Sequence, residues 1–332
     1  MSRVNASASL AVLVLCLASA SASAGPSVLL FPALGRPDGV VLQGRVLADK
    51  PQGDSALVRN LSRLATPNLK GARVELRFQG AEAIVTSGDD GNFQATLPAP
   101  KKHPFAVGSH EAEAMVTGAS VKARVEILAD AVPFLLVSDF DDTVAISEVT
   151  RPDKLLTNAL LRDADTQQVV PGMAGFYGCL GAQGGAAPAF ALVSGSPVQF
   201  TPRVGAFLAR HGFPPGFGLY LRDIGPGTLS GYKQPIIRDL MRRFPWPVVL
   251  VGDSGEKDPE VYAQIREEFP GRVRAIYIRD AGHTEDAQRF KGMMLFQDAG
   301  AAAAHAAQEG LARSACVTTA FPPPAAQARD TP

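Results

Sequence analysis

Residues 132–143 read Val-Pro-Phe-Leu-Leu-Val-Ser-Asp-Phe-Asp-Asp-Thr, and this stretch decides the fold class of the 332-residue chain. An apolar run without alternation is typical of a parallel strand that is covered on both faces. Asp139 and Asp141 would emerge together beyond the carboxyl end of that strand, because alternate side chains share a face. Ligands of open α/β sheets bind at this edge. The stretch therefore predicts a site with two carboxylates at the edge of a parallel sheet.

Apolar strands and amphipathic helices alternate from residue 131 onward. The expected strands cover residues 132–137, 189–193, 247–251, 273–278 and 292–296. The expected helices cover residues 172–180, 199–211, 234–244, 259–269 and 300–312. This alternation predicts an α/β domain over 131–313, a Rossmann-like, doubly wound parallel sheet with helices on both faces.

Residues 25–130 show a different pattern, with short alternating segments separated by turn residues such as Gly88-Asp89-Asp90-Gly91. The expected strands there cover residues 40–47, 72–78, 81–87, 92–97, 110–116 and 121–127. No helical stretch of comparable quality interrupts them. Several short strands with turns between them predict a small antiparallel β-sandwich that precedes the α/β domain.

Both ends of the chain differ from the folded parts. Residues 1–24 combine Arg3, an apolar run over 10–17 and small residues at 22–24, which is typical of a secretory signal cleaved before Gly25. We therefore expect an exported protein, periplasmic or secreted in a bacterium. Its only remaining cysteines, Cys179 and Cys316, could form one disulfide, although the sequence does not decide whether they pair. The Pro- and Ala-rich segment 314–332 is expected to be disordered.

The charge of the chain excludes some partners. Lys plus Arg equals Asp plus Glu at 32 each, so no overall field favours nucleic acid. The mature chain has no apolar run long enough for a transmembrane helix, which leaves a transient contact with a membrane surface open. Four residues after the second helix could line the rim of such a contact, but packing is the preferred interpretation because apolar residues are mostly core. They are Phe213, Phe217, Leu219 and Tyr220.

Three further polar residues are expected at the same edge of the sheet as the two aspartates. Ser194 follows the strand 189–193, Asp253 follows the strand 247–251, and Lys233 begins the helix before that strand. Each of them alone has an ordinary explanation, such as a helix cap or a solvated surface. Together they indicate a catalytic site, because the carboxyl ends of parallel strands share one edge.

In this order, these residues resemble the motifs of the haloacid dehalogenase superfamily of phosphotransferases. The finer similarity, over about residues 135–311, is to the phosphatidate phosphatase catalytic domain family. The motifs that carry it are Asp139-Phe140-Asp141-Asp142-Thr143, Val170-Pro171-Gly172-Met173, Val193-Ser194-Gly195-Ser196-Pro197, Tyr220-Leu221-Arg222-Asp223, Gly252-Asp253-Ser254-Gly255-Glu256-Lys257-Asp258 and Ile276-Tyr277-Ile278-Arg279-Asp280.

The resemblance implies hydrolysis of a phosphate monoester. Asp139 would be the nucleophile that forms an aspartyl-phosphate, and Asp141 would act as general acid and then as general base. Ser194 and Lys233 would bind the phosphoryl oxygens, and Lys233 would also offset charge in the transition state. Thr143 would brace the loop.

The resemblance also implies Mg²⁺, which takes hard oxygen ligands. Asp139, the backbone carbonyl of Asp141 and Asp253 would hold the ion, and Asp258 would support the metal site indirectly.

The substrate remains open at this point. Phosphatidate, cleaved to diacylglycerol and phosphate, comes first by resemblance, and a soluble phosphate ester is the alternative. Relatives usually carry Asn between the two serines where this chain has Gly195, so the substrate range could differ. A dehalogenase is disfavoured because a halide needs no proton from Asp141. A catalytically inactive binding protein is the alternative from another class, although none of the acidic and basic motif residues is missing.

Overall fold

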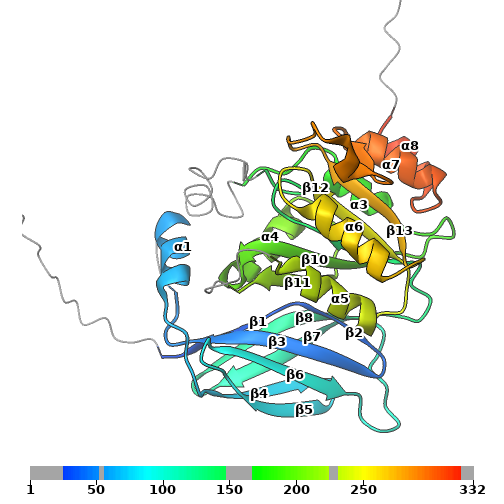
Figure 1. The fold of residues 1–332 in the computed structure, drawn as a ribbon. Coiled ribbons are helices and arrows are strands. Elements are labelled where there is room, and N and C mark those ends of the chain that lie inside the picture. Colours follow the sequence, from blue (N-terminus) through cyan, green and yellow to red (C-terminus); the bar gives the residue numbers. More distant parts are fainter. Residues whose placement is uncertain (1–24, 52–55, 147–166, 224–230, 323–332) are drawn as a thin grey trace, which may run out of the picture.

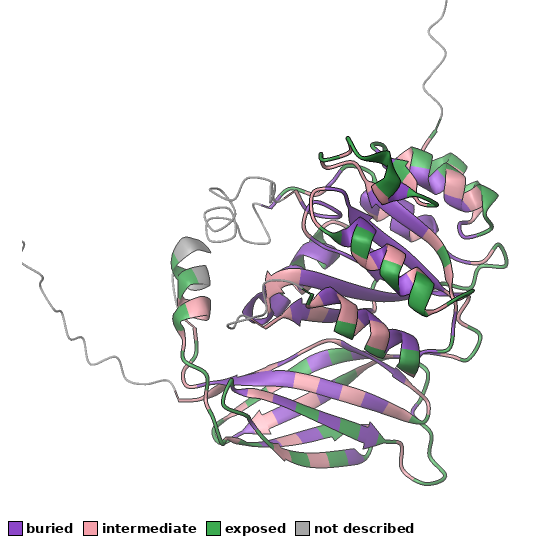
Figure 2. Cartoon of the chain, viewed as in Figure 1, coloured by how far each residue is buried: buried purple, intermediate pink, exposed green. Residues whose placement is uncertain are grey.

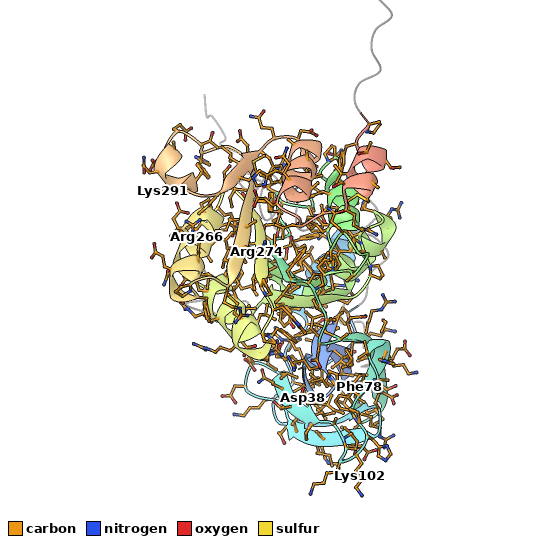
Figure 3. All side chains as sticks on the ribbon, turned by 90° about the vertical axis from the view of Figure 1, so that its right-hand side faces the viewer. Asp38, Phe78, Lys102, Arg266, Arg274 and Lys291 are labelled. Atoms are coloured by element: carbon orange, nitrogen blue, oxygen red, sulfur yellow. A yellow bond between two sulfur atoms is a disulfide. The ribbon has the colours of Figure 1, made fainter. Side chains whose placement is uncertain are left out.

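The computed structural model describes residues 25–51, 56–146, 167–223 and 231–322, which form a mixed α/β structure with two parts (Figure 1). A curled β-sheet is built from the N-terminal residues, and a parallel sheet with helices is built from the rest. Figure 3 shows the same division from another side: Asp38, Phe78 and Lys102 mark the curled sheet, while Arg266, Arg274 and Lys291 mark the parallel part.

The parallel sheet has six strands in the order β11-β10-β9-β12-β13-β14, and all neighbours in it are parallel. Its strands are β9 (Leu135–Ser138), β10 (Ala189–Pro197), β11 (Phe217–Arg222), β12 (Val248–Asp253), β13 (Val273–Arg279) and β14 (Met294–Phe296). The first of these six strands in the sequence, β9, lies in the middle, with β10 on one side and β12 on the other. The strand order therefore reverses at β9, which is where such sheets bind ligands.

Helices cover both faces of this sheet, as the sequence predicts. They are α3 (Met173–Cys179), α4 (Thr201–Arg210), α5 (Lys233–Arg243), α6 (Asp258–Glu268) and α7 (Ala299–Gln308). One apolar cluster joins α3, α4 and α7 to one face, and another joins α5 and α6 to the other. Every residue of β9 is buried, so the run 135–138 has no alternation. The neighbouring strand β10 is likewise buried over Ala189–Ser194 (Figure 2).

Two elements of this part differ from expectation. The segment around Leu219 forms the edge strand β11. Phe213, Phe217 and Leu219 are buried, and Tyr220 is partly buried against the core, as the preferred packing interpretation predicts. Six residues after a helix were too short a signal to separate a strand from a packed loop. The expected disorder of 314–332 is wrong over Ser314–Ala320, which forms α8; residues 323–332 lie outside the described residues.

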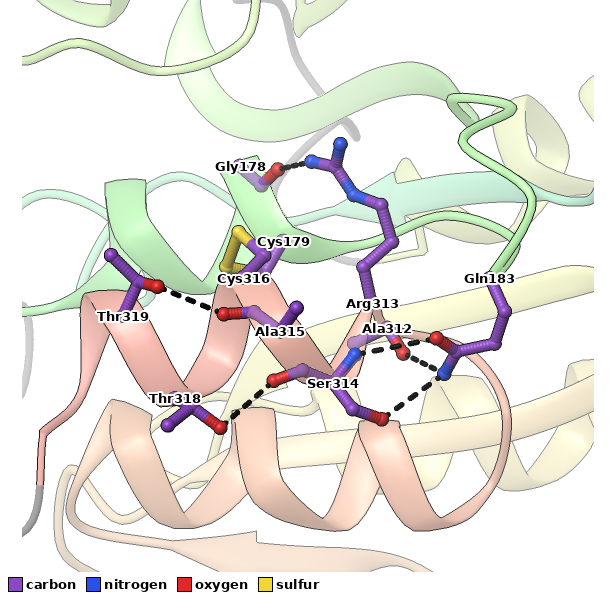
Figure 4. Close-up of a disulfide and its surroundings, with 10 residues drawn as sticks. All are labelled: Gly178, Cys179, Gln183, Ala312, Arg313, Ser314, Ala315, Cys316, Thr318 and Thr319. Carbon is purple, nitrogen blue, oxygen red and sulfur yellow. Dashed lines mark hydrogen bonds between the residues drawn. A yellow bond between two sulfur atoms is a disulfide. The ribbon is translucent and has the colours of Figure 1, made fainter.

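Helix α8 is tied to α3 by a disulfide between Cys179 and Cys316, which are 137 positions apart in the sequence (Figure 4). Arg313, just before α8, donates a backbone hydrogen bond to the carbonyl of Cys179 at 2.9 Å and a side-chain one to the carbonyl of Gly178. The covalent link and these bonds hold in place a segment whose composition alone suggests disorder.

The N-terminal part is one hydrogen-bonded sheet of eight strands, most of them antiparallel. They are β1 (Ser27–Leu30), β2 (Ala33–Arg36), β3 (Gly39–Leu47), β4 (Arg73–Phe78), β5 (Ala81–Thr86), β6 (Asn92–Pro98), β7 (Gly108–Val116) and β8 (Ala119–Ile127). The sheet curls around its own apolar cluster, so two separate sheets of a sandwich are not confirmed. The sequence did not predict β1 and β2, because four-residue strands are too short to show a period. The expectation that no helix interrupts these strands is wrong over Ala56–Ala65, which forms helix α1.

The curled sheet packs against the edge strand β11 of the parallel sheet. The backbone N–H of Leu219 donates to the carbonyl of Pro32 at 2.9 Å, and Leu34 is fully buried in the apolar cluster around α5. Arg45, only 1% exposed, pairs with Asp223 at the end of β11. The curled sheet thereby covers an edge that would otherwise present unpaired backbone groups.

No helix in the described residues is long and apolar enough to cross a bilayer. The expected signal over residues 1–24 lies outside the described residues, as do residues 147–166 between Asp139 and Ser194.

Candidate active site

The site lies at the carboxyl end of β9, where the strand order reverses. Asp139 follows Ser138 directly, and its backbone N–H donates to the carbonyl of Val251 on β12 at 2.9 Å. The loop then turns sharply, with Asp142 in the left-handed region at φ 54°. Arg279 supports this turn by donating to the carbonyl of Asp142 at 2.6 Å. A left-handed residue other than glycine is typical of loops whose shape the surrounding structure imposes.

Asp139 and Lys233 form a buried ion pair. Lys233 begins α5 and is 4% exposed, and its Nζ lies 2.8 Å from Oδ1 of Asp139, which is 1% exposed. Thr143 donates to the other oxygen of Asp139, Oδ2, at 3.2 Å. Thr143 therefore braces the carboxylate itself, a more direct role than the bracing of the loop that we expected.

Two more carboxylates complete an acidic cluster around Lys233. Asp253 ends β12 and Asp258 begins α6; together with Asp139 they place one carboxylate oxygen each within 4.8 Å of one another. Asp258 also pairs with Lys233, and Glu256 lies 3.6 Å from the same ammonium group. The buried carboxylates of Asp139 and Asp258 thus share one buried cation, and the Asp253 carboxylate lies beside them without an ion pair to Lys233.

Backbone geometry explains how Asp253 and Asp258 come so close. The N–H groups of Gly255 and Glu256 donate to Oδ1 of Asp253 at 2.7 and 3.2 Å, which fixes this carboxylate in the turn before α6. Gly252 provides the space for Asp258, because a Cβ at Gly252 would collide with the Asp258 carboxylate. Oδ2 of Asp253 is buried and has no hydrogen-bond partner among the described residues.

Burial and mutual repulsion perturb the acids. Burial raises the pKa of Asp139 well above its usual value, against the opposing effect of Lys233. Burial and the neighbouring charge of Asp258 raise the pKa of Asp253 to about 8. Burial would lower the pKa of Lys233, but the charges of Asp139 and Asp258 outweigh it and raise that pKa. The cluster has more negative charge than one lysine balances, which favours a further cation or a proton.

Asp141 faces a different set of groups. Ser194 and Ser196 both donate to Oδ2 of Asp141, at 3.1 and 2.9 Å. Burial raises the pKa of Asp141 even though these two hydrogen bonds lower it. The side chain of Asp141 therefore stays out of the acidic cluster, and within the described part of the chain no donor reaches its Oδ1.

The structure gathers every site residue that the sequence predicts. Asp139, Lys233, Asp253 and Asp258 form one buried cluster, while Asp141 and Ser194 form a hydrogen-bonded pair beside it. An Asp258 carboxylate oxygen lies within 4.8 Å of oxygens of both Asp139 and Asp253, whereas the resemblance implies only an indirect role for Asp258. Sequence reasoning gave no role to Glu256 and Ser196, although both lie inside the motifs that carry the resemblance.

Sequence comparisons match the part of the chain that carries these residues. Residues 134–280 match the family model described as "Phosphatidate phosphatase APP1, catalytic domain". Phosphatidate phosphatase APP1 of Saccharomyces cerevisiae is 32% identical over 153 residues, covering 43% of this chain and 25% of the yeast protein. An uncharacterized protein of Schizosaccharomyces pombe is 31% identical over 157 residues, which cover 44% of this chain and 25% of the S. pombe protein.

The matched part of this chain spans about a quarter of the length of these two relatives. Among solved structures, the Pnkp1/Rnl/Hen1 complex covers 51% of this chain and 46% of its own chain at 16% identity, with a TM-score of 0.31. A likeness of that size carries no argument about function or fold, so the APP1 family match rests on sequence.

Proposed function

We propose that this protein is a Mg²⁺-dependent phosphatase that hydrolyses phosphate monoesters through an aspartyl-phosphate on Asp139, with phosphatidate as the first substrate to test. The observation that carries the proposal is the ion pair of 2.8 Å between Asp139 and Lys233 at the carboxyl end of β9. The nucleophile and the cation for the phosphoryl group stand next to each other there. The match of residues 134–280 to a phosphatidate phosphatase family supports the substrate class.

The domain assignment belongs to the same proposal. Residues 131–313 would form a haloacid dehalogenase-like phosphatase domain, because the six parallel strands carry the ordered motifs at one edge. Residues 25–130 would form the separate β domain, and residues 1–24 a signal that is removed on export. The disulfide between Cys179 and Cys316 supports export to the periplasm or the medium, because disulfides persist in oxidising compartments.

The residues present fit a divalent cation. Asp139, Asp253 and Asp258 would hold it, since their oxygens lie within 4.8 Å of one another and Oδ2 of Asp253 is buried without a partner among the described residues. Mg²⁺ prefers such oxygen ligands. When bound, the ion would offset the repulsion between these carboxylates and the phosphate of the substrate.

In the first step, a carboxylate oxygen of Asp139 attacks phosphorus, and an O–P bond forms while the ester O–P bond breaks. The departing alkoxide takes a proton from Asp141, whose raised pKa favours the protonated form. Both serine hydroxyls donate to Oδ2 of Asp141, so Oδ1 is the oxygen that can carry this proton. The products are an alcohol and phosphorylated Asp139.

In the second step, the Asp141 carboxylate removes a proton from water, and the water oxygen attacks phosphorus. The O–P bond to Asp139 breaks, which releases inorganic phosphate and restores both aspartates to their starting states. Lys233 lies close enough to Asp139 to offset charge on the phosphoryl oxygens in both steps.

Two assays test the proposal. Purified mature protein with Mg²⁺ should hydrolyse p-nitrophenyl phosphate and should lose this activity in EDTA. Phosphatidate in mixed micelles, compared with soluble phosphate esters at equal concentration, then decides between the lipid and the soluble alternatives. Absence of turnover on all of these substrates by Mg²⁺-loaded protein would refute the phosphatase proposal and would favour a binding protein.

A further inference from the structure

Gly195 lies against Tyr232 in the candidate site. Gly195 stands between Ser194 and Ser196, and a Cβ added to it would meet the hydroxyl of Tyr232 at 2.7 Å and its Cζ at 3.3 Å. Real Cβ atoms essentially never approach another atom below about 3.0 Å. The phenol ring of Tyr232 therefore occupies the space that a side chain at Gly195 would need.

The hydroxyl of Tyr232 is buried and has no hydrogen-bond partner in the described part of the chain. Buried hydroxyl groups are nearly always hydrogen-bonded, so each exception needs a specific reason. Arg222 gives a second sign of the same kind, because its Nε is also buried without a partner among residues 25–51, 56–146, 167–223 and 231–322. The Tyr232 hydroxyl and the neighbouring Arg222 Nε are thus two buried donors without an acceptor among the described residues, which points to a ligand that accepts hydrogen bonds there.

The ring of Tyr232 lies within reach of two cations. The guanidinium carbon of Arg222 lies 5.7 Å from the ring centre, and Nζ of Lys233 lies 6.0 Å from it. Both distances are within the range of a cation–π interaction. These contacts, with α5 beginning directly after Tyr232, hold the ring in one orientation and direct its hydroxyl toward Gly195.

The hydroxyl also faces the charges of the acidic cluster. Burial raises the pKa of Tyr232, and the carboxylates of Asp139 and Glu256 raise it further against the effect of Lys233. The group is therefore a neutral phenol, which is able to donate a hydrogen bond to a ligand. A donor fixed on a rigid ring adds direction to the charge that the flexible Lys233 supplies.

We propose that Tyr232 is a substrate-binding residue whose hydroxyl donates a hydrogen bond to a phosphoryl oxygen of the substrate, next to Ser194 and Lys233. Arg222 supports the ring through its cation–π contact. Gly195 is required because a side chain there would collide with the Tyr232 hydroxyl. The inference rests on the proposed phosphatase function, and it gives Gly195 a steric role beside the Tyr232 hydroxyl.

Binding of inorganic phosphate in the presence of Mg²⁺, measured by calorimetry, tests this inference without turnover. Tyr232→Phe keeps the ring but removes the donor, so the phosphate Kd should rise by about tenfold or more, the effect of one hydrogen bond to a charged group. KM for p-nitrophenyl phosphate should rise with it. Tyr220→Phe is the matched control, because its hydroxyl accepts from Arg243 at 3.3 Å at the other end of α5; it should leave Kd unchanged.

A double-mutant cycle tests the steric part. Gly195→Ala should weaken phosphate binding in the wild-type background, where the new Cβ meets the hydroxyl at 2.7 Å, and should do so less in Tyr232→Phe, where the nearest atom is Cζ at 3.3 Å. Additive losses would overturn the steric argument, and a Kd within about twofold of wild type in Tyr232→Phe would overturn the inference. If wild-type protein binds phosphate but hydrolyses no ester, the proposed function fails while the binding test still decides the role of Tyr232.

Discussion

Replacing Lys233 with Met is the sharpest test of the acidic cluster. Lys233 is the cation nearest to Asp139 and Asp258, and all three side chains are at most 5% exposed. Removing one partner of a buried ion pair costs roughly 3–5 kcal/mol, because the other charge stays buried and unpaired. At roughly 2–4 °C of melting temperature per kcal/mol, we expect the variant to melt about 6–20 °C lower near neutral pH.

The loss should grow with pH. A carboxyl whose pKa is raised in the folded state binds more protons there than in the unfolded chain, so stability falls as pH rises from about the usual Asp value of 3.8 through the raised pKa. Without Lys233 the pKa of Asp139 rises further, and the gap between variant and wild type widens toward higher pH. Turnover should fall by roughly 10² or more because the phosphoryl charge loses its partner.

Thermal melts followed by circular dichroism, at several pH values, and kcat on p-nitrophenyl phosphate measure both effects. Arg238→Met is the matched control, because Arg238 lies on the same helix and forms an exposed ion pair with Glu268 at 2.6 Å. Exposed pairs contribute little, so its melting temperature and kcat should stay near wild type. A Lys233→Met variant with wild-type melting temperature and with kcat within about tenfold of wild type would refute the reasoning.

Three further changes test other parts of the structure. Asp139→Asn should abolish measurable turnover with little loss of fold, since it removes the nucleophile's charge and nearly keeps its shape. Arg45→Met should lower the free energy of unfolding in urea by roughly 1–3 kcal/mol, a value reduced for the 35% exposure of its partner Asp223. Replacing Cys179 and Cys316 with Ser should cost roughly 2–5 kcal/mol, because their bond closes a loop across 137 positions.

Each of these has its own control. Lys122→Met is the control for Arg45→Met, because Lys122 lies on the same curled sheet and forms an exposed ion pair with Glu111 at 3.3 Å. It should leave the urea midpoint unchanged. Equal midpoints for the two variants would contradict a stabilising role for the pair of Arg45 with Asp223. Reduced wild-type protein should melt like the double serine variant, and a reduced protein as stable as the oxidised one would show that the disulfide adds nothing. For Asp139→Asn, turnover within about tenfold of wild type would exclude a nucleophilic role.

Much of the site could be read from the sequence because it depends on local pattern and on one rule of topology. The run before Asp139 has no alternation, which marks a strand covered on both faces, and the strands that precede Ser194 and Asp253 have the same character. Since parallel strands place their carboxyl ends at one edge, polar residues that end such strands must meet there. The order of the residues along the chain was therefore enough to predict their proximity.

The sequence by itself thus determined the parallel sheet, its helices and the edge at which the site lies. Only the tertiary structure decided how the charges pair: that Asp258 shares Lys233 with Asp139, and that Tyr232 fills the space beside Gly195. The physical reason is that local periodicity reports which face of an element is buried, but not which residue of a distant element packs against it. The same limit applies to the pairing of Cys179 with Cys316.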